Sequence, residues 1–529
     1  LNTTAHNLSN VNTEGYTRQQ ITFADSTYVN VFSKSLNKGK YGLGVDIDAI
    51  SRIRNEFIDR SYRTESSRLG FYESQANAVY EVEDWFGEMQ GVTYQQHITN
   101  LYNAVNELTK NPTSTIARSS LIQNATAFID RSEAIYSGLK DYQVTLNTEV
   151  NNMVEKINSL GQKIYNLNKG IVKVEAEGVE RANDLRDSRD LALDELSKYI
   201  DIDYYETKDG EVIVSAENVP FITKNDIAKM SVREEGTYGL LIPQWEGYQQ
   251  DVYNFDKQAN NANDTDKGKL KGLLIARGVI EVNYTDIPVM PERADYDLTT
   301  EQGMAEYNSA MDAYQQKQDY YNKYIEPSAI LSAIAGFDKL VNGIVTAMND
   351  VLCPETTMDT TKELADADGN ILKAEKYVYN ASTHDVLYDS HGNVVAGKEN
   401  GDGTYSYEAS EKLYVDANQE ETENIDSMTY KILDMSKAGY GMDDDETRGV
   451  ELFKRNGTDR YKQITGADGS TIYVRNNLDV TGFETDYTLG NLIVNPEASQ
   501  NVGTLPLSTE HGKEDFSKVN ELIDTFSNK

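Results

Sequence analysis

The feature that most constrains this chain is a run of apolar residues spaced alternately four and three positions apart. Polar residues flank it on both sides. The members of this bundle seam are Leu146, Val150, Met153, Ile157, Leu160, Ile164, Leu167, Ile171 and Val174. Such a repeat places one apolar stripe along a helix and is typical of a helix that lies against a partner helix. The sequence therefore predicts one long helix with a coiled-coil-like seam.

A second seam with matching spacing occurs between residues 330 and 351, so we expect the two long helices to pack in one bundle. Between residues 353 and 481, Asp-Gly, Asn-Gly and His-Gly pairs separate short alternating segments, which is typical of β-hairpins. The predicted fold class is α+β multidomain. A long-helix, coiled-coil-like bundle is built from both chain ends, and all-β domains are inserted in it.

The same patterns divide the chain into six segments. These are a helical part at 1–200, a β-hairpin region and helix start at 201–280, a Tyr- and acid-rich insertion at 281–327 with a surface helix near 301–324, a bundle helix at 328–352, a β-rich outer region at 353–480, and a C-terminal return to the bundle at 481–529.

Composition limits the functions open to this chain. Its 529 residues hold 50 Lys and Arg against 86 Asp and Glu, a formal charge of −36. Like charges repel phosphates, so we expect no nucleic-acid partner and no anionic membrane surface. No stretch approaches the roughly 20 apolar residues that span a bilayer, and no signal peptide stands at the front. Cys353 is the single cysteine, which excludes an intramolecular disulfide and a Cys-based metal site.

Catalytic and metal-binding motifs are absent or better explained by turns. The sequence has no Gly-x-Ser-x-Gly elbow, no phosphate-binding loop and no His-Glu-x-x-His helix. His384 and His391 lie near two aspartates, but a solvated hairpin explains them better than a metal site. Residues 366–370 begin like a calcium loop, but the loop's required glycine and glutamate are missing. We therefore expect a non-enzymatic protein with no catalytic residue, cofactor or metal.

The most informative motif lies at residues 7–18, which read Asn-Leu-Ser-Asn-Val-Asn-Thr-Glu-Gly-Tyr-Thr-Arg. We interpret it as the end of an amphipathic helix, with Ala5, Leu8 and Val11 facing inward, followed by a turn. Asn and Ser side chains can hydrogen bond the last helical carbonyls or nearby amides, and Gly15 permits a left-handed backbone. A simple helix stop would explain Gly15 but not the concentration of Asn and Ser.

This run closely resembles the N-terminal signature of bacterial flagellar rod, hook and hook-associated proteins. Other stretches are similar to the hook-associated protein 1 family, whose members stand at the hook–filament junction. They are 42–47 with the following Ile50, Arg52 and Arg54, Asn111-Pro112 with Arg118, 182–190, 268–273 and 489–496. The resemblance covers residues 1–280, 328–352 and 480–529. Hook and rod proteins carry a β-rich stretch soon after the signature, and we expect it to be missing here.

The resemblance implies a structural adaptor of the bacterial flagellum that joins hook to filament. Such a protein is secreted through the flagellar export channel and is extracellular. The implied partners are hook protein, a second junction protein (hook-associated protein 3), further copies in a ring or helical layer, and a dedicated export chaperone. The family's first helical residues and final helix are absent from this sequence, so we expect a terminally truncated chain.

The resemblance also suggests roles for the two residue sets. The signature residues would form the turn that leaves the innermost helix of the axial tube; they are Asn7, Leu8, Ser9, Asn10, Asn12, Gly15 and Tyr16. The bundle-seam residues are interpreted as intramolecular core rather than interface.

Two alternatives stay open. Another axial protein, either hook or distal rod, would share the front motif. A surface adhesin or glycan-binding protein could instead use residues 353–480, where many tyrosines could stack on sugars.

Overall fold

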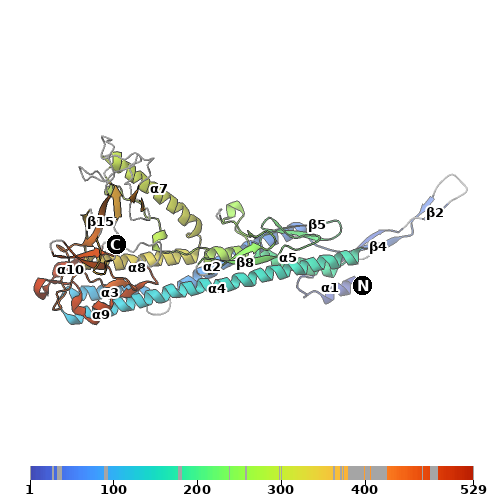
Figure 1. Cartoon of the computed structure of the whole chain (residues 1–529). Helices are drawn as coiled ribbons and strands as arrows, with labels where there is room; N and C mark the ends of the chain where they lie inside the picture. The colour runs from blue at the N-terminus through green and yellow to red at the C-terminus, as the bar shows by residue number, and fades with distance from the viewer. Residues whose placement is uncertain are drawn as a thin grey trace. The chain divides into compact units, whose positions relative to one another are not determined.

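The chain is a mixed α+β protein with long helices and small antiparallel sheets (Figure 1). It divides into two compact units. Unit 1 comprises Leu1–Glu81, Tyr142–Glu281 and Pro327–Ile330, and unit 2 comprises Val82–Asp141, Val282–Glu326 and Leu331–Lys529. The computed structural model describes residues 2–26, 29–31, 39–87, 93–176, 181–236, 239–255, 259–296, 298–299, 301–360, 364–369, 372, 375–378, 398–399, 405–406, 426–466, 469–476 and 487–527.

The described helices include two that exceed thirty residues. These two are α2 and α4. The described α-helices are α1 (Asn2–Ser9), α2 (Glu56–Phe86), α3 (Tyr94–Leu108), α4 (Thr115–Glu175), α5 (Asn183–Tyr199), α6 (Lys269–Arg277), α7 (Glu301–Tyr324), α8 (Ala329–Leu352), α9 (Pro496–Gln500) and α10 (Phe516–Ser527). With 61 residues, α4 is about 90 Å long at 1.5 Å per residue. The bounds of α7 agree with the surface helix predicted near 301–324.

The strands pair antiparallel throughout the described residues. In unit 1 the sheets are β1 (Gln19–Asp25) with β4 (Val45–Arg52), β2 (Val29–Val31) with β3 (Gly39–Tyr41), β5 (Ile202–Glu206) with β6 (Val212–Ala216) and β7 (Val219–Ile222), and β8 (Met230–Glu235) with β9 (Leu240–Trp245) and β10 (Gln250–Asp251).

In unit 2, one sheet joins β11 (Glu355–Thr360), β12 (Glu375–Val378), β15 (Asp426–Leu433), β17 (Tyr461–Thr465) and β18 (Thr471–Arg475). The remaining pairs are β13 (Lys398–Glu399) with β14 (Tyr405–Ser406), β16 (Phe453–Arg455) with β19 (Leu492–Val494), and β20 (Ser508–Thr509) with β21 (Lys513–Glu514). Much of the predicted outer region, including His384 and His391, lies outside the described residues.

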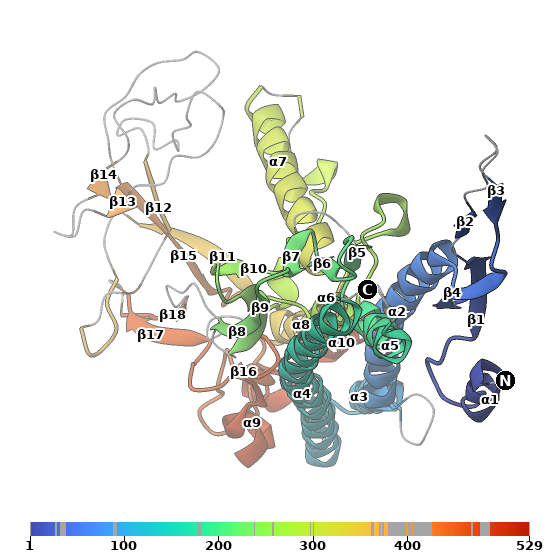
Figure 2. The same cartoon turned by 90° about the vertical axis from the view of Figure 1, so that its right-hand side faces the viewer.

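Residues 19–52 correct two predictions. This stretch was expected to be part of a helical region, and a β-rich segment after the signature was expected to be missing. Instead β1 and β4 pair side by side (Figure 2). The sequence does carry the signal, because apolar residues alternate with polar ones from Val45 to Ala49, and a period of two is a strand period.

The bundle seam lies on α4, and most of it is buried. Buried members are Leu146, Val150, Met153, Ile157, Leu160, Ile164 and Ile171, whereas Leu167 is partly exposed and Val174 is 38% exposed. Within unit 1, this half of α4 is covered by α5 and by strands. A Cβ atom on Gly161 would lie 2.5 Å from the Phe221 ring of β7, so the missing side chain makes room for a strand. The expected partner helix is thus replaced here in part by small sheets.

Asparagines attach these strands to α4. Asn158 donates from Nδ2 to the Met230 carbonyl (2.8 Å) and accepts at Oδ1 from the Met230 amide (2.9 Å). Asn168 makes the same pair of bonds with Val212, at 2.8 and 3.1 Å. Asn147 bonds the Gly239 carbonyl and the Leu241 amide, both at 3.1 Å. The side-chain amide thus offers each strand a donor and an acceptor, as a neighbouring strand would.

Unit 2 brings distant parts of the chain together around α3, α8 and the start of α4. Tyr102 of α3 packs edge-on against Phe526 of α10, with ring centroids 5.7 Å apart. Fully buried Arg118 donates to the carbonyls of Pro112 (2.8 Å) and Leu505 (2.9 Å), and to the Ser508 hydroxyl (2.8 Å). Burial lowers the pKa of Arg118 to about 10. The N-terminal and C-terminal parts of unit 2 are therefore held by direct side-chain contacts.

Two carboxylates hold the C-terminal 489–492 motif. Asp338 of α8 accepts from the Leu489 amide at 2.7 Å, and Glu133 of α4 accepts from the Gly490 amide at 2.9 and 3.0 Å.

Asn349 of α8 repeats the asparagine arrangement, since it accepts from the Leu452 and Phe453 amides and donates to the Phe453 carbonyl. We expected no stretch long and apolar enough to span a bilayer, but α8 is one by length and composition. Its Ile334, Phe337 and Val341 are buried inside the fold.

Replacing Asn158 with alanine should lower the free energy of unfolding of unit 1 by about 2 kcal/mol. Two hydrogen bonds are lost, and the Met230 backbone groups lose their partner. Asn152→Ala is the matched control, because Asn152 lies on the same helix with its side chain exposed. Chemical denaturation of the two variants measures the difference. Equal stabilities would show that the amide pairing contributes nothing.

A buried carboxyl in unit 1 makes stability depend on pH. Burial raises the pKa of Glu217 to about 7, although Lys271, 4.0 Å away, acts to lower it. The folded state therefore keeps a proton that the unfolded chain releases near pH 4.5, and stability falls as pH rises from about 4.5 to 7. Asp201, Lys267 and Tyr253 are the other titratable groups nearby.

Glu217→Gln should stabilise the protein at pH 8 by about 3 kcal/mol, at 1.36 kcal/mol per pKa unit, and should flatten the fall between pH 5 and 7. Denaturation midpoints measured across that range test this. A variant whose pH profile matches that of the parent would contradict it.

Candidate assembly site

The signature folds back on itself around Asn7. Its Nδ2 donates to the Gln19 carbonyl at 2.9 Å, and its Oδ1 accepts from the Gln19 amide at 2.9 Å. The same Oδ1 accepts from the Tyr16 hydroxyl at 2.7 Å, and that hydroxyl also lies 3.0 Å from Nδ1 of His6. Burial and the nearby Asp187 and Asp184 raise the pKa of Tyr16, so its hydroxyl keeps its proton. One asparagine thereby fixes α1 to the first residue of β1.

The other polar signature residues finish helix α1. Ser9 Oγ and Asn10 Nδ2 both donate to the His6 carbonyl at 3.0 Å, and the Thr13 hydroxyl donates to Asn10 Oδ1 at 3.2 Å. The His6 carbonyl also accepts from the Asn10 amide at 3.2 Å, so these side chains add bonds to the last turn of α1. Asn12 is exposed.

Gly15 brings the turn against α5. Its φ of +79° lies in the left-handed region, and a Cβ atom there would lie 3.1 Å from Cβ of Leu191. Both the backbone conformation and the close approach therefore favour glycine.

The predicted inward face of α1 is wrong. Ala5 is exposed, Leu8 is 74% exposed and Val11 is 71% exposed. The reason is that α1 contacts unit 1 through its polar residues Asn7 and His6, so its apolar residues face away from the described part of the fold.

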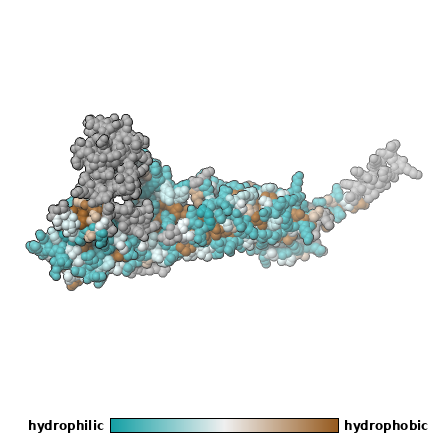
Figure 3. All heavy atoms as spheres, in the orientation of Figure 1, coloured by the Kyte–Doolittle hydropathy of each residue, from teal (hydrophilic) through white to brown (hydrophobic). Residues whose placement is uncertain are grey.

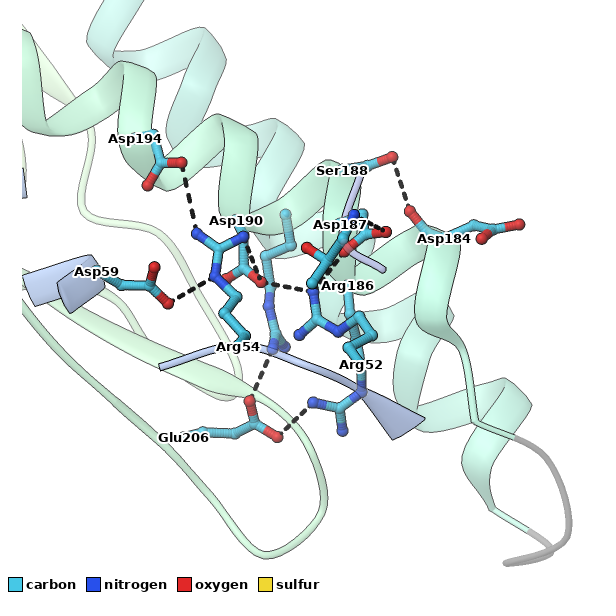
Figure 4. Close-up of polar contacts among 12 residues, drawn as sticks. Arg52, Arg54, Asp59, Asp184, Arg186, Asp187, Ser188, Asp190, Asp194 and Glu206 are labelled. Carbon is cyan, nitrogen blue, oxygen red and sulfur yellow. Dashed lines mark hydrogen bonds and ion pairs between the residues drawn. The ribbon is translucent and has the colours of Figure 1, made fainter. Parts of the chain in front are cut away.

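Helix α5 anchors the signature and the β1–β4 ribbon through its acidic residues (Figure 4). Asp187 accepts from the Thr17 amide at 3.1 Å and pairs with Arg52 Nη1 at 2.8 Å. The same Arg52 nitrogen lies 2.7 Å from Asp190. Although burial acts to raise it, the charges of Arg54 and Arg52 hold the pKa of Asp190 below its ordinary value. The start of β1 and the end of β4 are thus tied to one turn of α5.

The network continues into α2. Arg54 pairs with Asp59 at 2.5 Å and with Asp194 at 3.5 Å. Buried Arg63 pairs with Asp194 at 2.7 Å and donates to the Asp190 carbonyl at 3.3 Å. Arg63 is buried and its partner Asp194 is about one fifth exposed, so removing that carboxylate would leave a buried positive charge with fewer acceptors.

The basic residues of α5 face the other way. Arg186 makes a two-pronged pair with Glu175 at the end of α4, with both contacts at 2.8 Å, and a further pair with Glu206 of β5 at 2.6 Å. Arg189 donates to the Gly210 carbonyl at 2.6 Å and pairs with Glu206 at 2.8 Å. Side chains from one helix therefore join the signature turn, the ribbon, α2, α4 and the β5–β6 hairpin.

Sequence reasoning missed this network. The 182–190 run was noticed only as part of a resemblance, and Arg52 and Arg54 were noticed in the same way. A signal was present, because basic residues at 52 and 54 and acidic residues at 184, 187, 190 and 194 stand out as opposite, periodic charges.

The arrangement can fix geometry but holds no catalytic group. Its carboxylates are paired with arginines, and within the described residues no group of three or more His, Cys, Asp or Glu could hold a metal ion. In the 366–369 turn, which begins like a calcium loop in sequence, Asp366 pairs with Lys462 at 3.2 Å.

Around the network, apolar side chains face outward, including Phe23 (66% exposed), Val45 (66%) and Phe57 (77%).

Comparisons with known proteins show similarity to one family. Residues 79–310 match the family model described as the flagellar hook-associated protein FlgK helical domain. The chain is 30% identical over 303 residues to flagellar hook-associated protein 1 of Bacillus subtilis, covering 55% of this chain and 60% of that protein. It is 26% identical over 211 residues to flagellar hook-associated protein 1 of Escherichia coli, covering 38% of this chain and 36% of that protein.

Among solved structures, the flagellar hook junction protein FlgK from Burkholderia pseudomallei aligns with a TM-score of 0.41 and 12% identity, over 85% of this chain and 66% of that chain. The matches to the curated relatives therefore span less than two thirds of their length.

Replacing Asp187 with alanine should loosen the signature turn while leaving the rest of unit 1 folded. The Thr17 amide loses its acceptor and Arg52 loses one of its two carboxylates. Hydrogen exchange of residues 16–22 should speed up at least tenfold. Ser188→Ala is the control, because Ser188 is exposed and its hydroxyl bonds only the preceding turn. Unchanged exchange in the Asp187 variant would remove the anchor role from α5.

Proposed function

We propose that this chain, which belongs to the flagellar hook-associated protein 1 family, is a structural adaptor at the junction between the hook and the filament of the bacterial flagellum. It acts outside the cell, as a part of the flagellum and without enzymatic activity. The curated relatives named above carry the printed name of hook-associated protein, and one solved structure is described as a hook junction protein.

The observation that carries the proposal is the anchored signature turn. Asn7, Tyr16 and Asp187 fix the path of the chain between α1 and β1, while Leu8, Val11 and Phe23 face outward. A junction needs this combination, because a rigid connection must present a defined apolar surface to neighbouring subunits. The directional bonds inside set the geometry, and apolar burial outside supplies the free energy of association.

The proposed architecture places the helical body, built from both chain ends, in the axial layers of the flagellum. Helix α4 would form part of this body, with its seam covered by α5 and small sheets in unit 1. The acidic β regions would project outward and keep the particle soluble. Teal residues predominate on the surface seen in Figure 3, with separate brown patches, in keeping with a charge of −36.

The proposed partners are hook protein on one side, hook-associated protein 3 on the other, and further copies of the chain in the same layer. An export chaperone would accompany the protein to the flagellar export channel. The acid excess and the paired charges of the site favour no nucleic-acid partner.

Deletion of the complete gene should leave cells with bare hooks and no filaments. Electron microscopy would count both structures, and an immunoassay of the medium should find filament protein that was exported but not assembled. Restoring the parent gene should return filaments.

Other outcomes would point elsewhere. Cells without hooks would assign the chain to the rod or to the hook itself, and intact filaments would refute an axial role. An Asp187→Ala gene should restore filaments poorly, whereas Ser188→Ala should restore them fully.

A further inference from the structure

Helix α2 distributes its residues in the opposite way from an ordinary surface helix. Its buried face consists mainly of small or polar residues, whereas an amphipathic helix normally buries its apolar stripe. The buried residues are Arg63, Ser67, Gly70, Phe71, Ser74 and Ala78. Apart from Phe71, the large apolar residues between Ile58 and Val79 are therefore left for the outside.

Close packing explains the small inner residues. A Cβ atom on Gly70 would lie 2.5 Å from the carbonyl oxygen of Lys198, and one on Gly272 of α6 would lie 2.4 Å from the carbonyl oxygen of Phe71. Ser74 and Gln75 donate to the carbonyls of Lys269 and Gly272, at 3.1 and 2.8 Å. The backbones of α2 and α6 approach so closely that this face has no room for large apolar side chains.

The outer face carries a regular stripe. Its members recur at spacings of four and three residues over three heptads and are all exposed; they are Ile58 (60%), Tyr62 (52%), Glu65, Leu69 (60%), Tyr72 (50%), Ala76 and Val79 (43%). The hydroxyl of Tyr72 bonds Asp266 at 2.9 Å, but half of that side chain remains exposed. This outer stripe has the spacing of a coiled-coil seam yet lies uncovered in unit 1.

We propose that the outer stripe of α2 is the surface on which a second copy of this chain docks. The inference rests on the proposed function, because it names the face through which neighbouring subunits of one layer meet.

Charge favours a second copy over a basic partner. Residues 58–79 hold three acidic residues (Asp59, Glu65, Glu73) and three basic ones (Arg60, Arg63, Arg68), a sum of zero in a chain of charge −36. Two copies can therefore meet here without the repulsion expected elsewhere on their surfaces, whereas a strongly basic partner would find more favourable faces.

The size of the stripe indicates where the contact forms. From Ile58 to Val79 it extends roughly 32 Å at 1.5 Å per residue, and a helix is about 10 Å wide. A stable pair usually buries about 800 Å² on each partner, more than this strip alone provides. The contact should therefore be one of several in an assembled layer, and free subunits should not dimerise through it. Exposed Phe57 and Ile53 directly precede the stripe and can extend the contact.

Photo-cross-linking tests the inference. A benzophenone side chain replaces Leu69 in the complete protein, and the experiment is done in flagellated cells. Irradiated flagella should yield a product with twice the mass of the protein, containing two copies of the chain. The control places the same group at Asn77, which is exposed on the same helix but lies outside the stripe, and its yield should be at least tenfold lower.

Three results would overturn the inference. They are a product with a different protein, an internal cross-link at the mass of one subunit, and equal yields at positions 69 and 77. In each case the protein is still found in the flagellum, so the proposed function survives. If the protein is absent from purified flagella, the proposed function fails and this inference fails with it.

A charge substitution tests the same surface without cross-linking. Leu69→Glu should reduce the number of filaments at least tenfold, while Asn77→Glu, which adds the same charge off the stripe, should leave it unchanged. Circular dichroism and melting temperatures of both variants should equal those of the parent, because Leu69 is exposed. Normal filament numbers in the Leu69→Glu strain would contradict the inference.

Discussion

A side-chain amide that pairs with the backbone of a strand is the interaction on which the rest of this structure depends. A helix uses its own backbone groups internally, so it cannot satisfy the edge of a neighbouring strand. Asparagine can, because one amide carries both an acceptor and a donor. Asn158 and Asn168 in unit 1, Asn349 in unit 2 and Asn7 in the signature all serve this purpose. Short strands can thereby cover long helices without leaving unpaired polar groups.

Buried charged side chains are likewise held by hydrogen-bonding groups close to them. The chain is strongly acidic, and two of its buried arginines, Arg63 and Arg118, have acceptor groups around them. Arg63 lies among the aspartates of α5, whereas Arg118 is held mainly by carbonyl oxygens, and burial lowers its pKa without removing its charge at neutral pH. Such contacts are directional, so they fix where the signature turn, the ribbon and the C-terminal motif lie. Apolar packing alone would set these positions less sharply.

Sequence patterns predicted the long elements well because periodicity over several turns outweighs local preference. The seam on α4 and the bounds of α7 follow from such periods. The elements that cover the seam could not be predicted in the same way. The pattern shows that a stripe is buried, but it does not show what covers the stripe. The asparagines beside the seam were interpreted only as its polar flanks, whereas Asn168 is buried and bonds a strand. The β1–β4 ribbon was missed because a helical interpretation of the first 200 residues overrode a short alternating signal.

The two faces of α2 connect this internal order to assembly. Because backbones meet at Gly70 and Gly272, the inner face is restricted to small and polar residues, and its stability comes from hydrogen bonds and ion pairs. The exposed apolar residues of the outer stripe therefore add little to the fold of the isolated subunit. Their heptad spacing has a physical use only if another surface covers them, because the free energy falls when exposed apolar side chains leave water. A subunit built this way can fold through directional contacts and keep its apolar surface for its neighbours.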